Sequence, residues 1–468
     1  MRKLKLKRKK RRFSKAFLRL LRNIARGAAL AAGIPAIALI GAAAYFEAAL
    51  PDVYYAEDPS GFSIRQYRVL TPVAEEAEEE AVPVLVGAAD AEKEAEKLEE
   101  SLQSDGETSR FSLLLGGVIP VKTVVVCETD TRYVVPSGNV FGLKMLTDGA
   151  VVAALSPIET SSGTSCPAQQ AGLQAGDIIL SAGGEAVDSF DTLSAAIEAA
   201  GESGRELAIT YERDGATLET ALTPVQSADG NWLAGLWVRD SSAGIGTITF
   251  YDPASGCFAA LGHGVCDADT GVLLPLQWGK VCGATVLGVT RGTAGSPGEL
   301  QGAFLNSAFS LSGLLGKDGL VSSGTVLQNL PCGLMVRAEG DSLIRAADNQ
   351  MLPVASAQEV HSGEAQILST IGGSEPQLFS AQIEKVTYSA DEPSRNLVIR
   401  ITDPTLIAAT GGIVQGMSGS PILQDGKLVG AVTHVFVSDP EKGYGIFAET
   451  MLSALDAASA ETTGDTAA

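Results

Sequence analysis

Short runs of apolar residues that alternate with turns dominate most of the chain. Between residues 111 and 225, strand-like segments such as Thr123–Cys127 and Ala150–Leu155 accompany one helical segment, Phe190–Ala200. From residue 226 to residue 455, runs of Val, Ile, Leu and Thr are broken by Gly, Pro and Asp about every ten residues, which predicts antiparallel sheets closed into barrels or a sandwich. We therefore expect a mainly β protein with some α: an α+β domain over 111–225, a β-barrel domain over 226–455 and a polar tail over 456–468.

The N-terminal part has a different pattern. Residues 1–26 hold 13 Lys and Arg and no Asp or Glu, and residues 27–46 carry no charge. About 20 apolar residues span ~30 Å as a helix, which matches the bilayer core. We expect a transmembrane anchor at 27–48, with the basic segment 1–26 in the cytoplasm and the rest of the chain outside. A cleaved signal peptide is the alternative. Acidic runs predict that residues 49–110 are mainly a linker.

Charge and cysteine content exclude several classes of protein. The net charge is −21, and the chain after residue 26 holds 21 bases against 55 acids. Because nucleic-acid affinity depends on cationic contacts with phosphate, we expect no nucleic-acid partner for this part. The six cysteines form no CxxC pair, which argues against zinc-ribbon and thioredoxin-like sites. We expect no cofactor.

The segment over 111–225 resembles a PDZ domain of the bacterial protease type. The stretch Gly172–Asp177, with the sequence GLQAGD, carries the resemblance, because two glycines bracket a turn between a short helix and a strand. PDZ folds bind a peptide as an added strand, and a glycine-bearing loop offers backbone N–H groups to the terminal carboxylate. The resemblance places that loop at Phe141, Gly142 and Leu143.

The segment Gly416–Pro421, with the sequence GMSGSP, is the strongest chemical signal. A nucleophilic serine needs a tight turn and small neighbours, so that its hydroxyl and the nearby backbone N–H groups are accessible. The pattern resembles the nucleophile loop of chymotrypsin-like peptidases, with Met417 where those enzymes usually have Asp. It implies that Ser418 is the nucleophile and that the N–H groups of Gly416 and Ser418 are the oxyanion donors. Ser420 is a poorer candidate, because Pro421 follows it directly.

A serine nucleophile needs a base, and the chain has three histidines. His263 is flanked by glycines after an apolar segment, so its imidazole can face a cleft, and we favour it as the general base. His434 lies on a strand and is the alternative, and His361 sits in a polar run typical of the surface. A metal site at His263, Cys266, Asp267 and Asp269 is too crowded to be a good ligand set, and we expect no metal.

Asp403 is the candidate for the group that orients the imidazole. It ends the alternating segment Ile399–Thr402, fifteen residues before Ser418. The order His263, Asp403, Ser418 would match that of chymotrypsin-like enzymes. The acid is much nearer the serine in sequence than it is in those enzymes.

Taken together, these segments resemble the family of stage IV sporulation protein B (SpoIVB) peptidases over residues 110 to 455. The resemblance rests on the anchor, the PDZ-like unit, Val238–Tyr251, Ala260–Gly264, Gly292–Glu299 and Thr410–Phe436. It implies a membrane-anchored serine endopeptidase of endospore formers, made in the forespore, with its catalytic domain in the intermembrane space. The expected substrate is a membrane-bound regulator of an intramembrane protease that processes a sigma factor.

The resemblance also implies that Ser418, His263 and Asp403 are catalytic. It leaves a C-terminal peptide, of a partner or of the chain itself, as the expected ligand of the PDZ groove. The competing hypothesis is a non-catalytic, membrane-tethered PDZ adaptor in which the Gly–Ser loop is structural.

Overall fold

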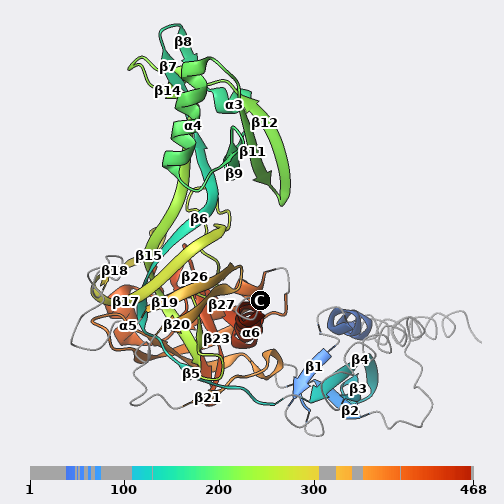
Figure 1. The fold of residues 1–468 in the computed structure, drawn as a ribbon. Coiled ribbons are helices and arrows are strands. Elements are labelled where there is room, and N and C mark those ends of the chain that lie inside the picture. Colours follow the sequence, from blue (N-terminus) through green and yellow to red (C-terminus); the bar gives the residue numbers. More distant parts are fainter. Residues whose placement is uncertain are drawn as a thin grey trace, which may run out of the picture. The chain divides into compact units, whose positions relative to one another are not determined.

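The computed structural model describes residues 38–47, 50, 53–56, 62–64, 69–74, 108–128, 130–304, 323–339, 351–389 and 392–464. The chain divides into two compact units, 1–129 and 130–468, and each is described by itself (Figure 1). The basic segment 1–26, residues 27–37 and 48 of the expected anchor and the acidic runs between 75 and 100 lie outside the described residues.

The first unit contains a helix over residues 38–47 and a small sheet. The sheet has the order β1 (Val53–Ala56), β4 (Ile119–Glu128), β3 (Thr108–Leu115), β2 (Leu70–Ala74). Phe46 of the helix is buried in one apolar cluster with Tyr54 and Phe111 of the sheet. The side-chain ammonium of Lys122 donates to the main-chain carbonyl of Leu50 at 2.5 Å, just after the helix. This part of the helix therefore packs against protein.

Membrane crossing is not seen in the described part of the chain. None of the helices described there combines the length and the apolar character that a bilayer span requires. The structure also differs from the predicted boundaries. β1, β2 and the start of β3 lie within the expected linker 49–110, and the rest of β3 and β4 belong to this sheet although 111–225 is assigned to the PDZ-like domain. The acidic runs dominate the local composition and hide these short strands.

A large sheet begins the second unit. Its strands follow the order β12 (Ala216–Leu222), β11 (Leu207–Arg213), β9 (Ile178–Ala182), β6 (Val140–Leu155), β17 (Leu276–Thr290), β19 (Ser323–Leu330), β20 (Gly333–Glu339), β16 (Cys257–Ala260), β15 (Leu236–Asp252), β5 (Tyr133–Pro136), β21 (Leu352–Pro353). β10 (Glu185–Ala186) pairs with β9, and β18 (Glu299–Phe304) pairs with β17. Two small hairpins are formed by β7 (Ile158–Thr160) with β8 (Gly163–Ser165) and by β13 (Val225–Gln226) with β14 (Trp232–Leu233).

Two long strands run through both ends of this sheet. β6 has 16 residues and β15 has 17, and they pair antiparallel from Leu155 opposite Leu236 to Val140 opposite Thr247. One end of β6 pairs with β9 and the other pairs with β17. Figure 1 shows the pair as a twisted ribbon that connects the part with α4 to the part with α5 and α6.

The part of the second unit around α4 is an α+β domain. It contains α3 (Pro167–Gln170) and α4 (Phe190–Ser203), whose Leu193 and Ile197 are buried against the sheet. α4 begins at Ser189, whose hydroxyl accepts the N–H of Thr192 at 3.3 Å. The expected helix at Phe190–Ala200 is confirmed.

β22 to β27 close into a barrel. Its strand order is β22 (Gly363–Ser369), β23 (Gln377–Val386), β24 (Leu397–Ile401), β27 (Asp439–Phe447), β26 (Lys427–Phe436), β25 (Pro421–Gln424). Apolar residues that alternate along these strands fill its interior, such as Ile367, Ile383 and Ile399. α5 (Pro404–Thr410) precedes β25, and α6 (Ala448–Gly464) follows β27. The closed barrel confirms the predicted barrel fold for these strands. The polar tail expected over 456–468 is wrong in its first part, because α6 continues through it to Gly464.

The loop expected at Phe141, Gly142 and Leu143 is wrong. These residues lie inside β6, paired with β15 on one side and β17 on the other, and Phe141 and Leu143 are buried. Gly142 serves close packing here: a Cβ at this position would lie 2.2 Å from the ring of Phe304. The glycine that suggests an anion-binding loop therefore makes room for a side chain in the sheet.

Candidate active site

Ser418 lies in the loop between α5 and β25. Its main-chain carbonyl accepts the N–H of Thr247 of β15 at 3.0 Å, and the hydroxyl of Thr247 donates to the carbonyl of Gly416 at 2.8 Å. The N–H of Gly419 donates to the carbonyl of Val432 at 2.7 Å. The loop is therefore held between β15 of the large sheet and β26 of the barrel.

Gly419 has to be glycine for this arrangement. Its φ is +97°, and a Cβ would lie 1.9 Å from the carbonyl oxygen of Thr247 and 2.6 Å from the backbone nitrogen of Leu261. Real side chains do not occupy such a space. The serine loop therefore lies directly on the segments that lead to His263.

Two N–H groups of the loop are available to a ligand. The N–H groups of Gln415, Met417, Gly419 and Ser420 all donate to backbone carbonyls. In the part of the chain that the structure describes, no acceptor is recorded for the N–H of Gly416 or Ser418. Unpaired N–H groups beside a serine hydroxyl are what an oxyanion site needs.

His263 follows β16 in a turn of unusual backbone. Leu261 and Gly262 both have positive φ, +68° and +71°, and this conformation is strained for leucine. The N–H of Leu261 donates to the carbonyl of Thr247 at 3.2 Å. Thr247 thus binds both the serine loop and the histidine turn. Ser418 and His263 therefore lie beside the same residue of β15.

The tautomer of His263 follows from its hydrogen bond. Its Nδ1 lies 2.8 Å from the carbonyl oxygen of Gly264. A carbonyl oxygen can only accept, so Nδ1 carries the proton and Nε2 keeps its lone pair. Burial lowers the pKa of His263 below its usual value, which keeps the imidazole neutral and able to accept a proton.

His434 lies against His263. The ring centroids are 4.7 Å apart with an angle of 35° between the planes. The register between β26 and β27 shifts between Val432 and Val435, so Thr433 and His434 form a bulge that turns them out of the regular ladder. The hydroxyl of Ser418 donates to the carbonyl of Thr433 at 2.7 Å. Ser418, His263 and His434 are therefore brought together.

His434 differs electrostatically from an ordinary histidine. Burial, and then the neighbouring His263 and Arg395, lower its pKa to about 4. Its Nδ1 is buried and has no hydrogen-bond partner among the described residues. His434 is thus neutral at physiological pH.

Asp403 has a different set of partners from the expected one. Its carboxylate accepts the N–H groups of Thr405 at 2.8 Å and Leu406 at 3.2 Å, as the N-cap of α5, and that of Ser380 at 3.3 Å. Although burial opposes ionisation, these backbone donors lower the pKa of Asp403. Within the described residues no hydrogen bond joins Asp403 to a histidine.

His361 and Ser420 take structural positions. His361 Nε2 lies 3.0 Å from a carboxylate oxygen of Asp425. The hydroxyl of Ser420 is buried and donates to that of Ser369 at 2.9 Å. Asp267 and Asp269, which follow the histidine turn in sequence, both pair with Arg239. Cys166, Cys257, Cys266, Cys282 and Cys332 are free thiols.

Sequence reasoning missed three backbone and side-chain contributions. Thr247 lies in Val238–Tyr251, one of the segments that carry the resemblance, but its own role has no signature because it acts through residues far away in sequence. The carbonyl groups of Gly264 and Thr433 also carry no signature, because every residue has one. The glycines on either side of His263 were the one available sign of an unusual backbone.

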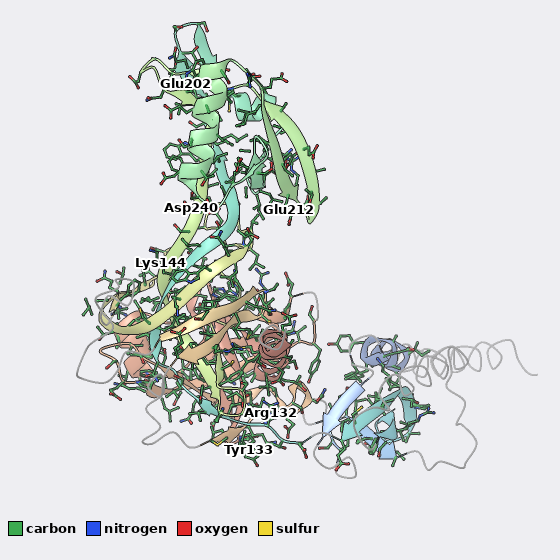
Figure 2. The ribbon with its side chains drawn as sticks, viewed as in Figure 1. Arg132, Tyr133, Lys144, Glu202, Glu212 and Asp240 are labelled. Carbon is green, nitrogen blue, oxygen red and sulfur yellow. The ribbon has the colours of Figure 1, made fainter. Side chains whose placement is uncertain are left out.

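In the α+β domain, β15 runs along α4. The carboxylate of Asp240 accepts the N–H of Phe190 at 2.9 Å at the start of the helix, and Trp232 of β14 packs closely on Gly201 near its end. Figure 2 labels Asp240 at the lower end of α4, with Lys144 further down the ribbon. Leu236 and Val238 of β15 pack against the core of this domain.

Comparisons with known protein families give a match for the segment that holds Ser418 and His263 and another for the α+β domain. Residues 230–452 match the family model described as SpoIVB peptidase S55, and residues 141–223 match that of the PDZ domain. No curated protein matches the sequence.

Solved structures with similar parts include a PDZ domain and two proteases. The PDZ domain of the SdrC-like protein from Listeria monocytogenes is 21% identical, with 19% of this chain and 87% of that chain covered and a TM-score of 0.16. The HtrA-type protease AlgW with decapeptide is 10% identical (47% and 54% covered, TM-score 0.27). The Rv3671c protease from M. tuberculosis, active form, is 15% identical (45% and 74% covered, TM-score 0.25).

The two family matches define the chain as a serine peptidase that carries a PDZ domain. Ser418 and His263, which are both held at Thr247 of β15, lie within the matched peptidase segment. The segment 230–452 of this peptidase is similar to the SpoIVB peptidases S55.

Proposed function

We propose that the chain cleaves peptide bonds with Ser418 as nucleophile and His263 as general base. The observation that carries the proposal is the shared anchoring of the two segments on Thr247, which receives the histidine turn at its carbonyl and holds the serine loop through its N–H and hydroxyl. His434 packs on the base, and Ser418 is partly exposed.

The geometry supports the following sequence of steps. Ser418 turns from the carbonyl of Thr433 towards the substrate, and Nε2 of His263 accepts its proton as the hydroxyl oxygen attacks the peptide carbonyl. The N–H groups of Gly416 and Ser418 donate to the developing oxyanion. His263 then gives the proton to the leaving amine, an acyl-enzyme remains on Ser418, and water releases it by the same route in reverse.

The wider role that we propose is regulatory proteolysis outside the membrane. The uncharged stretch 27–46 after the basic residues 1–26 supports a single-pass anchor with the N-terminus in the cytoplasm. The SpoIVB resemblance supports a sporulation function in which a membrane-bound regulatory protein is cleaved and an intramembrane protease becomes active. The PDZ domain would present a C-terminal peptide of the substrate, or of the chain itself, to the peptidase domain.

Labelling with a fluorophosphonate tests the catalytic part directly. The purified full-length protein should be labelled, and Ser418→Ala should abolish the label while unfolding by urea stays similar. Ser420→Ala is the matched control, because it removes the other hydroxyl of the same loop and should keep the label. A folded wild-type protein that never reacts would favour the non-catalytic PDZ adaptor, and a label kept in Ser418→Ala would refute the assignment of the nucleophile.

A further inference from the structure

A hollow of about 650 Å³ opens at the end of β26, next to the residues of the active site. Ala294 and Gly295 line one part, and the residues Val435–Ser438 with Tyr444 line the rest. Its volume lies in the range of about 300–1,000 Å³ that is typical of sites for small ligands. The catalytic steps proposed above do not involve this hollow.

The hollow is close to the nucleophile along one strand. Thr433, whose carbonyl accepts the Ser418 hydroxyl, and His434 directly precede Val435. Val435, the first residue of β26 that lines the hollow, is two residues from Thr433, or about 7 Å at a rise of about 3.3 Å per residue, and Val437 lies in the turn that follows β26. A side chain of a substrate bound at Ser418 can therefore reach the hollow.

The edge of β26 beyond Val432 can also bind a substrate main chain. β25 pairs with β26 as far as Pro421 opposite Ala431, and Gly419 and Ser420 of the serine loop then bond to Val432, so the recorded pairing on this side of β26 ends there in the described chain. An extended peptide can add to such an edge by backbone hydrogen bonds, with alternate side chains directed to one face. This arrangement aligns the substrate along the strand that lines the hollow.

The lining of the hollow selects for apolar groups. Val437 exposes 53% of its surface, and the rings of Phe436 and Tyr444 lie 4.5 Å apart. Among the described residues, those that line the hollow include no acidic or basic side chain. A charged side chain would lose hydration there without gaining a partner. The guanidinium of Arg395, 5.4 Å from the centre of the Tyr444 ring, further disfavours a cation.

We propose that this hollow binds the side chain of the substrate residue whose carbonyl Ser418 attacks, and that it selects a large apolar residue such as Leu or Phe. This inference rests on the proposed role of Ser418 and adds the class of substrate. It assigns a specificity role to Val437, which lies outside the groups that move protons.

Peptidyl diphenyl phosphonates test the proposal without knowledge of the natural substrate. Four probes that differ only in the side chain next to phosphorus (Leu, Phe, Glu and Lys) are reacted with the full-length protein. Each rate is divided by that of a fluorophosphonate without an amino-acid side chain, which measures the reactivity of Ser418 alone. We expect the Leu and Phe probes to react at least about tenfold faster than the Glu and Lys probes, as differences in pocket contacts produce.

Val437→Lys gives the specificity test, and Leu378→Lys is its matched control. Leu378 on β23 is similarly exposed, at 52%, and does not line the hollow. Val437→Lys should lower the normalised rate of the Leu probe about tenfold and raise the ratio of Glu to Leu, whereas Leu378→Lys should leave both unchanged. Equal rates for the four probes, or an unchanged ratio in Val437→Lys, would overturn the subsite while fluorophosphonate labelling still supports the peptidase. Absence of all labelling would overturn both.

Discussion

Replacement of Gly419 by alanine tests the contact on which the site depends. The new Cβ would lie 1.9 Å from the carbonyl oxygen of Thr247, whereas ordinary contacts begin at 3.4 Å. The serine loop and β15 would therefore have to separate by about 1.5 Å. The hydrogen bond from Thr247 N–H to the Ser418 carbonyl, now 3.0 Å, does not survive such a shift.

The expected loss of stability can be built from separate contributions. A positive φ of +97° costs about 1–3 kcal/mol for alanine, and forced repacking costs about 1–3 kcal/mol. The lost hydrogen bond adds about 1 kcal/mol. We expect Gly419→Ala to destabilise the protein by about 3–7 kcal/mol and to lower the rate of fluorophosphonate labelling of Ser418.

Gly426→Ala is the matched control. Gly426 also has a positive φ, +77°, but no atom lies within 4 Å of the position of its Cβ. The Gly426→Ala substitution should lower the free energy of unfolding by about 1–2 kcal/mol and leave labelling of Ser418 unchanged. Urea unfolding and labelling rates are measured for both variants. If the two variants have equal stability and equal labelling, the serine loop does not lie on Thr247 as described.

Three further predictions concern Asp403, His434 and the cysteines. Asp403→Ala should cost about 1 kcal/mol in urea unfolding, because it removes the cap of α5, and Asp403→Asn should cost only a few tenths; a loss of activity of about 10⁴-fold in folded Asp403→Asn would show that the acid also orients His263. The pKa of His434 is lowered from 6.5 to about 4, so as the pH falls the unfolded chain binds a proton before the folded chain does. The contribution of His434 to stability is therefore fully present above pH 6.5, and about 3 kcal/mol of it is lost as the pH falls to 4. His434→Phe should flatten this dependence in urea unfolding at several pH values, and equal slopes would contradict the assignment. A mild reductant should leave labelling unchanged because the cysteines of the second unit, which holds the active site, are free thiols, whereas a loss of label would reveal a functional disulfide.

The regular elements were largely predictable from local pattern. The alternation of apolar residues in Ile399–Thr402, the helical spacing of Phe190–Ala200 and the sequence of Gly416–Pro421 each contain their own structural signal. Gly416–Pro421 could be recognised because a few neighbouring residues are enough to encode a tight turn with glycine at positive φ.

Features that depend on distant partners could not be predicted. Gly142 has the sequence context of a loop, yet it is glycine because Phe304, far away in sequence, occupies the space beside it. Asp403 follows a strand and precedes Pro404, which fits both an N-cap and an acid that orients a histidine. Only the positions of Thr405 and Leu406 distinguish these two roles.

The ribbon of β6 and β15 has a mechanical consequence. Since the same two strands enter the PDZ sheet and also reach the serine loop, where Thr247 of β15 pairs with Val140 of β6, no free hinge separates the two parts of the second unit. Rotation of one part against the other must twist a ladder of backbone hydrogen bonds. The register irregularities between Trp237 and Val238 and between Arg239 and Ser241 are the places where that ladder yields most easily. A torque applied beside α4 is therefore carried along β15 to Thr247 as elastic deformation.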